Sequence, residues 1–154
     1  MMSNKNYTCA VSGNRVVQKD LDKNRLKEIF IKLITNAKIN TFLVGMALGF
    51  DTICFNVLET LKSEYDIKIV ACIPCRTQDY NFTKKQKEEY DRMLSVADEK
   101  IYVSNEYNNT CMFKRNRFLV DNSSIIVVYS RKKTGGTIYT KNYALKKGVP
   151  IIEI

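Results

Sequence analysis

The sequence predicts a single α/β domain with a mostly parallel sheet of about six strands and helices on both faces. Short apolar runs alternate about six times with stretches whose apolar residues recur at helical spacing. The chain has 154 residues, 45% of them hydrophobic, which suits one core. We see no linker or internal repeat, so we expect one domain over residues 1–154.

Six apolar runs have the length and residue types of buried strands. The run over 124–129 (SIIVVY) is the most continuous β-branched segment of the chain. The run over 67–73 stops at Pro74, which cannot donate to a strand ladder, and the run over 41–44 stops at Gly45. The expected strands are 7–11, 41–44, 67–73, 101–103, 124–129 and 151–154.

Five stretches between these strands carry apolar residues three or four positions apart, as helices do. Asp20 and Asp22 are possible N-caps of the first helix, and Thr83 with Gln86 fits a capping box that opens the third. Gly148 suits the C-cap of the last helix. The expected helices contain residues 26–37, 53–61, 83–97, 112–120 and 137–147.

The net charge of +9 is concentrated in the last third of the chain. Residues 110–154 contain nine basic and two acidic residues, a net charge of +7, whereas residues 1–109 carry only +2. Such a segment is either a solvated basic face or a positive field for a polyanion or a phosphorylated small molecule. Composition alone does not choose between them.

The chain has no histidine, which excludes Ser-His-Asp triads, histidine metal sites and imidazole acid–base catalysis. Any catalysis would have to use carboxylates, Lys, Cys, Tyr or backbone dipoles. No cofactor and no metal site is expected. No apolar run reaches the length of a membrane span, so no membrane partner is expected.

Five cysteines, an odd number, are scattered among apolar segments, and the N-terminus has no apolar signal region. Both features favour the reducing cytoplasm. Cys72 and Cys75 have the Cys-x-x-Cys spacing of redox sites, but Cys72 lies in a buried strand and no helix pattern begins at Cys75. Two core cysteines at a strand end are therefore the favoured interpretation, and redox activity is left open.

Glycines and small polar residues gather where three predicted strands end, over 12–15, 45–52 and 134–137. In a parallel sheet these ends meet at one edge, where helix N-termini offer amide groups to ligands. The turn Thr134-Gly135-Gly136-Thr137 suits phosphate, because its glycines let the backbone approach a ligand closely. The alternative is a plain loop with an N-cap.

Cations near these turns differ in how well they are placed. Arg15 lies directly in the first turn and is the best-placed single cation, unless it serves only a surface ion pair. Arg115 and Arg117 cannot share one face of a helix, so at most one of them is expected to face a ligand.

Five ordered blocks carry a family resemblance that covers nearly the whole chain. The sequence resembles the YpsA-like proteins of the SLOG superfamily, Rossmann-like domains related to the LOG phosphoribohydrolases and the DprA/Smf DNA-processing proteins. The blocks are SGNR (12–15), GMALGFDT (45–52), IPCRTQ (73–78), CMFKRNRFLVD (111–121) and GGTIYT (135–140).

This resemblance implies a nucleotide-derived ligand across the sheet edge, with the Gly-Gly-Thr turn on its phosphate. It also implies a functional Gly-x-acid step at Gly49 and Asp51. Asp51 would accept ribose hydroxyls or, alternatively, would simply cap a helix. The expected ligand-binding residues are Ser12, Gly13, Asn14, Arg15, Gly45, Met46, Gly49, Asp51, Arg115, Arg117, Gly135, Gly136 and Thr137.

Two departures from the superfamily favour binding over catalysis. The related phosphoribohydrolases carry a glutamate after their Gly-Gly turn, whereas residues 134–142 here contain no acid. Asn14 also stands where relatives often have histidine. We therefore expect a sensor or sequestering protein for a nucleotide signal, such as an ADP-ribose-like or cyclic-nucleotide derivative. The resemblance also implies a homo-oligomer.

Two alternatives are kept. One is an N-glycosidase, a phosphoribohydrolase of nucleoside monophosphates, with Asp51 or Glu106 as the acid and Arg115 beside it. The other is single-stranded DNA binding, with the basic segment on phosphates and Tyr129, Tyr139 and Tyr143 stacking on bases. The second alternative ranks last, because a basic surface near a phosphate turn serves a mononucleotide equally well.

Overall fold

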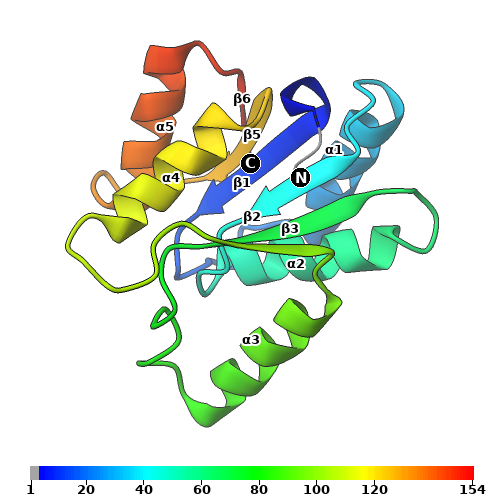
Figure 1. Cartoon of the computed structure of the whole chain (residues 1–154). Helices are drawn as coiled ribbons and strands as arrows, with labels where there is room; N and C mark the ends of the chain where they lie inside the picture. Colours follow the sequence, from blue (N-terminus) through cyan, green and yellow to red (C-terminus); the bar gives the residue numbers. More distant parts are fainter. Residues whose placement is uncertain (1–3) are drawn as a thin grey trace.

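The computed structural model describes residues 4–154 and confirms the α/β fold (Figure 1). A short 3-10 helix over Lys5–Tyr7 precedes the first strand. The elements are β1 (Thr8–Gly13), α1 (Lys23–Thr35), β2 (Thr41–Val44), α2 (Phe50–Leu61), β3 (Lys68–Ile73), α3 (Lys84–Val96), β4 (Glu99–Tyr102), α4 (Cys111–Asp121), β5 (Ile125–Tyr129), α5 (Gly136–Lys147) and β6 (Ile151–Glu153).

All six strands are parallel, in the order β4-β3-β2-β1-β5-β6. The chain steps outward from β1 to β4 and then crosses back to place β5 on the free side of β1. This crossover places α4 and α5 on one face of the sheet and leaves α1 and α2 on the other (Figure 1). The strand order therefore reverses between β1 and β5, which is where open α/β sheets bind ligands.

Two apolar layers hold the sheet between its helices. Strand alternation divides β1 between them, since Cys9 and Val11 join the layer with α1, α2 and α3, and Ala10 joins the layer with α4 and α5. Phe30 and Phe42 meet edge-to-face in the first layer, with ring centroids 5.4 Å apart.

The helix ends follow the predicted caps, with one exception. Asp22 caps α1 by accepting hydrogen bonds from two first-turn amides, and Thr83 and Gln86 form the predicted capping box at α3. Gly148 ends α5 in the left-handed conformation, with φ of 72°. Asp20 is not a cap, because α1 begins at Lys23, directly after Asp22; its carboxylate instead accepts hydrogen bonds from the hydroxyl of Tyr129 and from Nε of Arg131.

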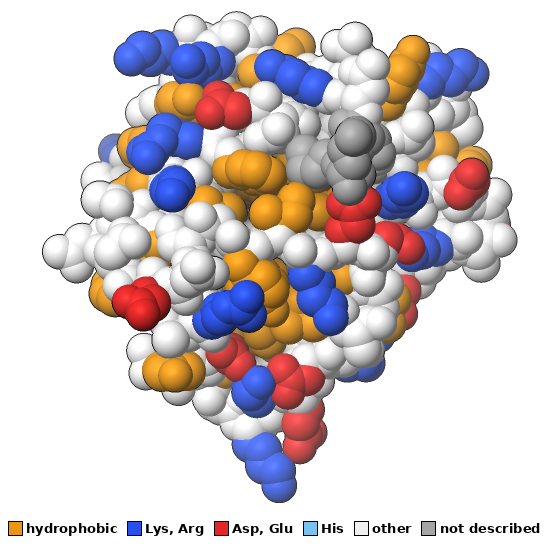
Figure 2. Space-filling model, in the orientation of Figure 1, with side chains coloured by type: hydrophobic (Ala, Val, Ile, Leu, Met, Phe, Trp, Pro, Cys, Tyr) orange, Lys and Arg blue, Asp and Glu red, His pale blue; other side chains and the backbone are white. Residues whose placement is uncertain are grey.

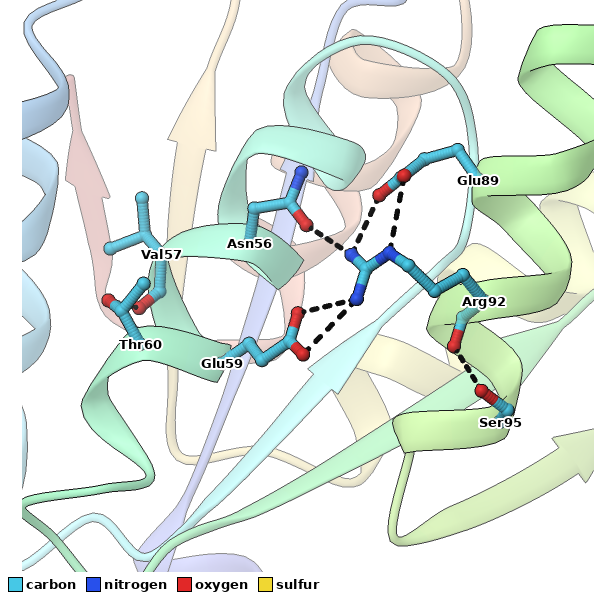
Figure 3. A network of polar contacts seen from close by, with 7 residues as sticks. All are labelled: Asn56, Val57, Glu59, Thr60, Glu89, Arg92 and Ser95. Atoms are coloured by element: carbon cyan, nitrogen blue, oxygen red, sulfur yellow. Dashed lines mark hydrogen bonds and ion pairs between the residues drawn. The ribbon is translucent and has the colours of Figure 1, made fainter.

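A polar network around Arg92 fastens α3 to α2 (Figure 3). The guanidinium donates to both carboxylate oxygens of Glu59, at 3.0 and 3.2 Å, and to Asn56 Oδ1 at 2.9 Å. It also pairs with Glu89, one turn earlier on α3, at 2.8 Å. This network supplements the apolar contacts that Tyr90 and Met93 make with the first layer.

We expect Arg92→Ala to lower the free energy of unfolding by about 1 kcal/mol, because a network of partly exposed charges contributes little more than that. Urea denaturation measures the change, with Glu88→Ala on the exposed side of α3 as the control. A loss as small as that of the control would show that apolar packing alone holds α3.

None of the helices in residues 4–154 is long and apolar enough to span a membrane. The expectation of no signal region rests partly on residues 1–3, which lie outside the described residues.

Candidate functional site

A cavity of about 510 Å³ opens at the sheet edge where β1 and β5 end, and the first turns of α2, α4 and α5 border it. Its position is the reversal point of the strand order, as expected for this class of fold. Its lining residues are Ser12, Gly13, Asn14, Arg15, Ala47, Asp51, Asn109, Met112, Phe113, Arg115, Asn116, Leu119, Lys132, Thr134, Gly135, Gly136 and Thr137.

Most of the residues predicted for the site line this cavity, and the remainder lie beneath or beside it. The lining set contains Ser12, Gly13, Asn14, Arg15, Asp51, Arg115, Gly135, Gly136 and Thr137. Outside the lining set are Gly45, Met46, Gly49 and Arg117.

Helix α4 contributes lining residues that the sequence reasoning missed. Met112 lies three positions before Arg115, and Leu119 lies four positions after it, so all three share one face of α4. Asn116 adjoins them. Helical spacing counted from Arg115 would have found this face, but it could not have shown that α4 closes the cavity.

Arg115 is a buried cation that ties three segments together. One guanidinium nitrogen donates to the carbonyl of Gly45 and to that of Cys72, the latter at 3.2 Å, while Nε donates to Asn116 Oδ1 at 2.9 Å. Burial lowers the pKa of this guanidinium, and the nearby Asp51 opposes that shift. The ends of β2 and β3 are thus fixed to α4 at the cavity wall.

Asp51 is the carboxyl group of the cavity, and it is only 5% exposed. Its Oδ2 accepts a hydrogen bond from the backbone N–H of Ala47 at 3.1 Å, whereas Oδ1 has no hydrogen-bond partner among residues 4–154. Burial raises the pKa of Asp51 to about 6, against the opposing effects of Arg115 and the Ala47 amide. A buried oxygen without a partner, in a cavity wall, is suited to accept a donor from a ligand.

The alternative that Asp51 is a simple N-cap is wrong. Gly49 is the N-cap of α2, and Asp51 is the second helical residue. Its carboxylate faces the turn before the helix and the cavity. The carboxylate is therefore not occupied by first-turn amides, as an N-cap carboxylate would be.

Gly45 and Gly49 shape the cavity from beneath. A Cβ on Gly45 would lie 2.7 Å from a guanidinium nitrogen of Arg115 and 3.0 Å from Asp51 Oδ2. Gly49 has φ of 82°, and a Cβ there would lie 2.1 Å from the carbonyl oxygen of Arg15. Both glycines let two pieces of this protein approach each other.

Met46 and Arg117 point away from the cavity. Met46 is buried in the first apolar layer, with a positive φ of 63° that carries the chain from β2 into the turn. Arg117 lies on another face of α4 and donates a hydrogen bond to the hydroxyl of Tyr139 at 2.8 Å. Of the two arginines that could not share a face, Arg115 is the one that lines the cavity.

Asn14 holds the turns after β1 and β5 together. Its side-chain Oδ1 accepts a hydrogen bond from the backbone N–H of Arg131 at 2.6 Å, and its backbone N–H donates to the carbonyl of Tyr129 at 3.1 Å. Its carbonyl accepts the N–H of Phe50, at the start of α2. An amide side chain is well suited to this bridging position.

The N-terminus of α5 is an open amide cradle at the cavity. Gly135 is its N-cap, with φ of 107°, and no side chain caps the helix. The N–H groups of the first helical turn, beginning at Gly136 and Thr137, therefore offer donors and a positive dipole end to an anion. With Arg15, Arg115 and Lys132 in the lining against one carboxyl group, the cavity favours a negatively charged ligand.

The two cysteines of the Cys-x-x-Cys pair lie in the protein interior. Cys72 and Cys75 are both buried, and burial raises the pKa of the Cys72 thiol to about 12, so it is not a thiolate at neutral pH. Within residues 4–154, no three His, Cys, Asp or Glu side chains form a group that could hold a metal ion.

The chain is similar to a described family and to two related proteins. A model of the family described as YspA SLOG (YpsA) matches residues 12–149. The chain is 34% identical over 138 residues to the SPbeta prophage-derived protein YoqJ of Bacillus subtilis (strain 168), covering 80% of each chain. It is 28% identical over 117 residues to the UPF0398 protein YpsA of the same strain, covering 71% of this chain and 65% of that protein.

Two solved structures share the fold at low sequence identity. DNA processing protein A (DprA) from Streptococcus pneumoniae matches with a TM-score of 0.67 and 19% identity, over 95% of this chain and 49% of that one. DNA processing protein A from Helicobacter pylori, described for its single-stranded DNA binding mode, matches with a TM-score of 0.65 and 14% identity, over 97% and 65%. This chain thus spans about half to two thirds of each.

Proposed function

The chain belongs to the YspA SLOG family, and from this premise we propose that its cavity binds a nucleotide or nucleotide-derived signal without catalysis. The protein would act as a sensor or a sequestering protein. The observation that carries the proposal is the pairing, in one cavity, of an uncapped helix N-terminus with a buried carboxyl oxygen that has no partner among the described residues.

In this proposal, the phosphate binds the first turn of α5. Gly135 and Gly136 are exposed and lack side chains, so a phosphate can approach the amides of the turn directly. Lys132 and Arg15 border the same cavity and supply positive charge without being buried. Thr137 adds a hydroxyl in the cavity lining.

In this proposal, the sugar binds Asp51. Its Oδ1 would accept a ribose hydroxyl, which satisfies a buried oxygen that otherwise costs about 1–3 kcal/mol. A ribose hydroxyl that donates to Asp51 favours the ionised carboxylate and lowers its pKa, whereas the negative charge of the phosphate raises it.

Calorimetric titration with a panel of nucleotides tests the proposal, and Gly136→Asp is the informative variant. A carboxylate in the first turn of α5 is compatible with the helix dipole, but it repels a bound phosphate. We expect it to weaken nucleotide binding by about tenfold or more. Asn142→Asp adds the same charge on an exposed part of α5 and should leave affinity within about twofold.

Binding weaker than the millimolar range for every nucleotide in the panel would overturn the proposal. Equal losses of affinity in Gly136→Asp and Asn142→Asp would still show that the protein binds nucleotides, but would contradict the binding of the phosphate at the first turn of α5. Thermal unfolding of both variants checks that neither loses its fold.

N-glycosidic cleavage is a second candidate, favoured by the raised pKa of Asp51, a property of general acids. Glu106, the other candidate acid, is exposed and lies outside the cavity lining. Incubation with nucleoside monophosphates and chromatography for free base tests this. Release of base that Asp51→Asn abolishes would establish N-glycosidic cleavage, whereas unchanged substrate at high protein concentration would exclude cleavage of these nucleotides.

Single-stranded DNA binding has one observation in its favour. Three aromatic side chains form a row from the cavity along α5: the ring centroids of Phe113 and Tyr139 are 4.5 Å apart, and those of Tyr139 and Tyr143 are 6.5 Å apart. Arg117 and Lys147 contact the tyrosines of this row. Tyr129 cannot join it, because it is buried against Phe50. That expectation was wrong, since alternation along β5 turns its last side chain into the core.

Figure 2 shows the face that carries α4 and α5, where Lys and Arg side chains lie as separate groups with Asp and Glu between them. This distribution of charge suits a small anionic ligand better than the long phosphate backbone of single-stranded DNA. A gel shift with a short oligonucleotide, repeated at rising salt, tests the DNA alternative. Submicromolar affinity that falls steeply with salt would favour single-stranded DNA over a nucleotide as the ligand.

The homo-oligomer and the cytoplasmic location implied above stay predictions. Light scattering of the purified protein measures the first.

A further inference from the structure

A second cavity of about 650 Å³ lies directly beside the first. Arg15, Ala47 and Met112 line both cavities and form the boundary between them. Each cavity falls within the range of about 300–1,000 Å³ that is usual for small-molecule sites, so each is large enough for a nucleoside-sized group.

The carbonyl of Gly45 links a residue that lines the first cavity, Arg115, to a residue that lines the second, Gln78. The carbonyl of Gly45 accepts from Arg115 on the side of the first cavity and from Gln78 Nε2, at 3.0 Å, on the side of the second. Gln78 Oε1 in turn accepts the hydroxyl of Tyr90 at 2.8 Å. Gln78 is therefore fixed before any ligand arrives, and the two cavities share one rigid partition.

Two exposed tyrosines border the second cavity. Tyr80 follows β3 and is 79% exposed, and Tyr107 follows β4 and is 66% exposed. Large aromatic side chains exposed beside a cavity are typical of binding sites, where they stack on planar rings. Leu48 and Phe82 add apolar surface to the same cavity. These features suit a second base, beside a first cavity that is itself large enough for a whole nucleotide.

We propose that the two cavities form one site for a dinucleotide, meaning two nucleosides joined through phosphate. One nucleotide occupies the cavity of Asp51 and α5, the phosphate linkage passes Arg15, and the second base stacks on Tyr80 and Tyr107. Arg15 is exposed at the boundary, so its guanidinium is free to pair with the linkage. This inference rests on the proposed nucleotide site and names its ligand class.

The test compares three adenine ligands and their guanine counterparts by calorimetry: the mononucleotide, the 5′–5′ dinucleotide and the linear 3′–5′ dinucleotide. We expect one dinucleotide to bind about tenfold or more tightly than its mononucleotide, the gain expected from stacking a second base. Tighter binding of the 5′–5′ dinucleotide would indicate a free dinucleotide as the ligand, and tighter binding of the 3′–5′ dinucleotide would indicate a fragment of nucleic acid.

The variant Tyr80→Ala/Tyr107→Ala should reduce the gain to about twofold and leave mononucleotide affinity unchanged. Tyr7→Ala, an exposed tyrosine at the opposite end of the sheet, is the matched control and should change neither affinity. Both tyrosines are exposed, so the double variant is expected to fold, which circular dichroism checks.

A mononucleotide that binds as tightly as both dinucleotides overturns this inference while the proposed function stands. A dinucleotide gain that survives in the double variant overturns the placement of the second base. If no mononucleotide or dinucleotide binds, the proposed function itself has failed.

Discussion

Replacing Gly49 by alanine is expected to lower the free energy of unfolding by more than about 3 kcal/mol, a larger loss than we expect from any other substitution named above. Two costs add. The φ of 82° is unfavourable for an L-residue, and the new Cβ would lie 2.1 Å from the backbone oxygen of Arg15. Since backbone rather than a flexible side chain is in the way, the turn after β1 and the start of α2 must move apart.

Gly148→Ala is the matched control for Gly49→Ala. Gly148 also has a positive φ, of 72°, but a Cβ there would meet nothing within 4 Å. Only the conformational cost applies, so we expect a loss of about 1 kcal/mol in urea denaturation. Equal losses in the two variants would contradict the close approach of Gly49 to Arg15.

Asp51→Asn is expected to change how stability depends on pH. The pKa of this carboxyl is about 6 in the folded protein, above its ordinary value of 3.8. The folded state therefore binds the proton more tightly than the unfolded state does. The stabilisation from the protonated form is complete below about pH 4 and is lost as the pH rises through 6.

Relative to Asp51→Asn, the original protein should thus lose about 2 kcal/mol of unfolding free energy between pH 4 and pH 7, most of what the full pKa shift represents, since each pKa unit corresponds to about 1.4 kcal/mol. Urea denaturation at several pH values measures the difference between the two proteins. Asp66→Asn, at an exposed position, controls for the loss of one carboxyl. A difference that stays constant over this pH range would show that folding does not shift the pKa of Asp51.

The fold was predictable because apolar spacing reports which face of each element is buried. The caps followed from chemistry that acts within four residues, as at Thr83 and Gln86. Asp20 was less predictable, because its partner Tyr129 lies 109 residues further along the chain. Local spacing carries no signal for such a contact.

The site was predictable in its turns but not in its wall. Turn residues such as Gly13 and Gly135 carry a local composition signal, whereas Asn116 enters the cavity only because α4 packs beside α5. Gly45 and Gly49 show a further limit. A glycine that admits a ligand and a glycine that admits another backbone segment look the same in sequence, and only the atoms that a Cβ would meet in the folded protein distinguish them.

The central claim is that a nucleotide phosphate rests on the first turn of α5. Backbone amide chemical shifts in ¹⁵N–¹H spectra, recorded while a mononucleotide is titrated into the protein, test it most directly. We expect the amides of Gly136, Thr137 and Ile138 to shift most, and Gly136→Asp to need about tenfold more nucleotide for the same shifts at Thr137 and Ile138. Saturating binding that leaves these three amides unmoved would contradict the claim.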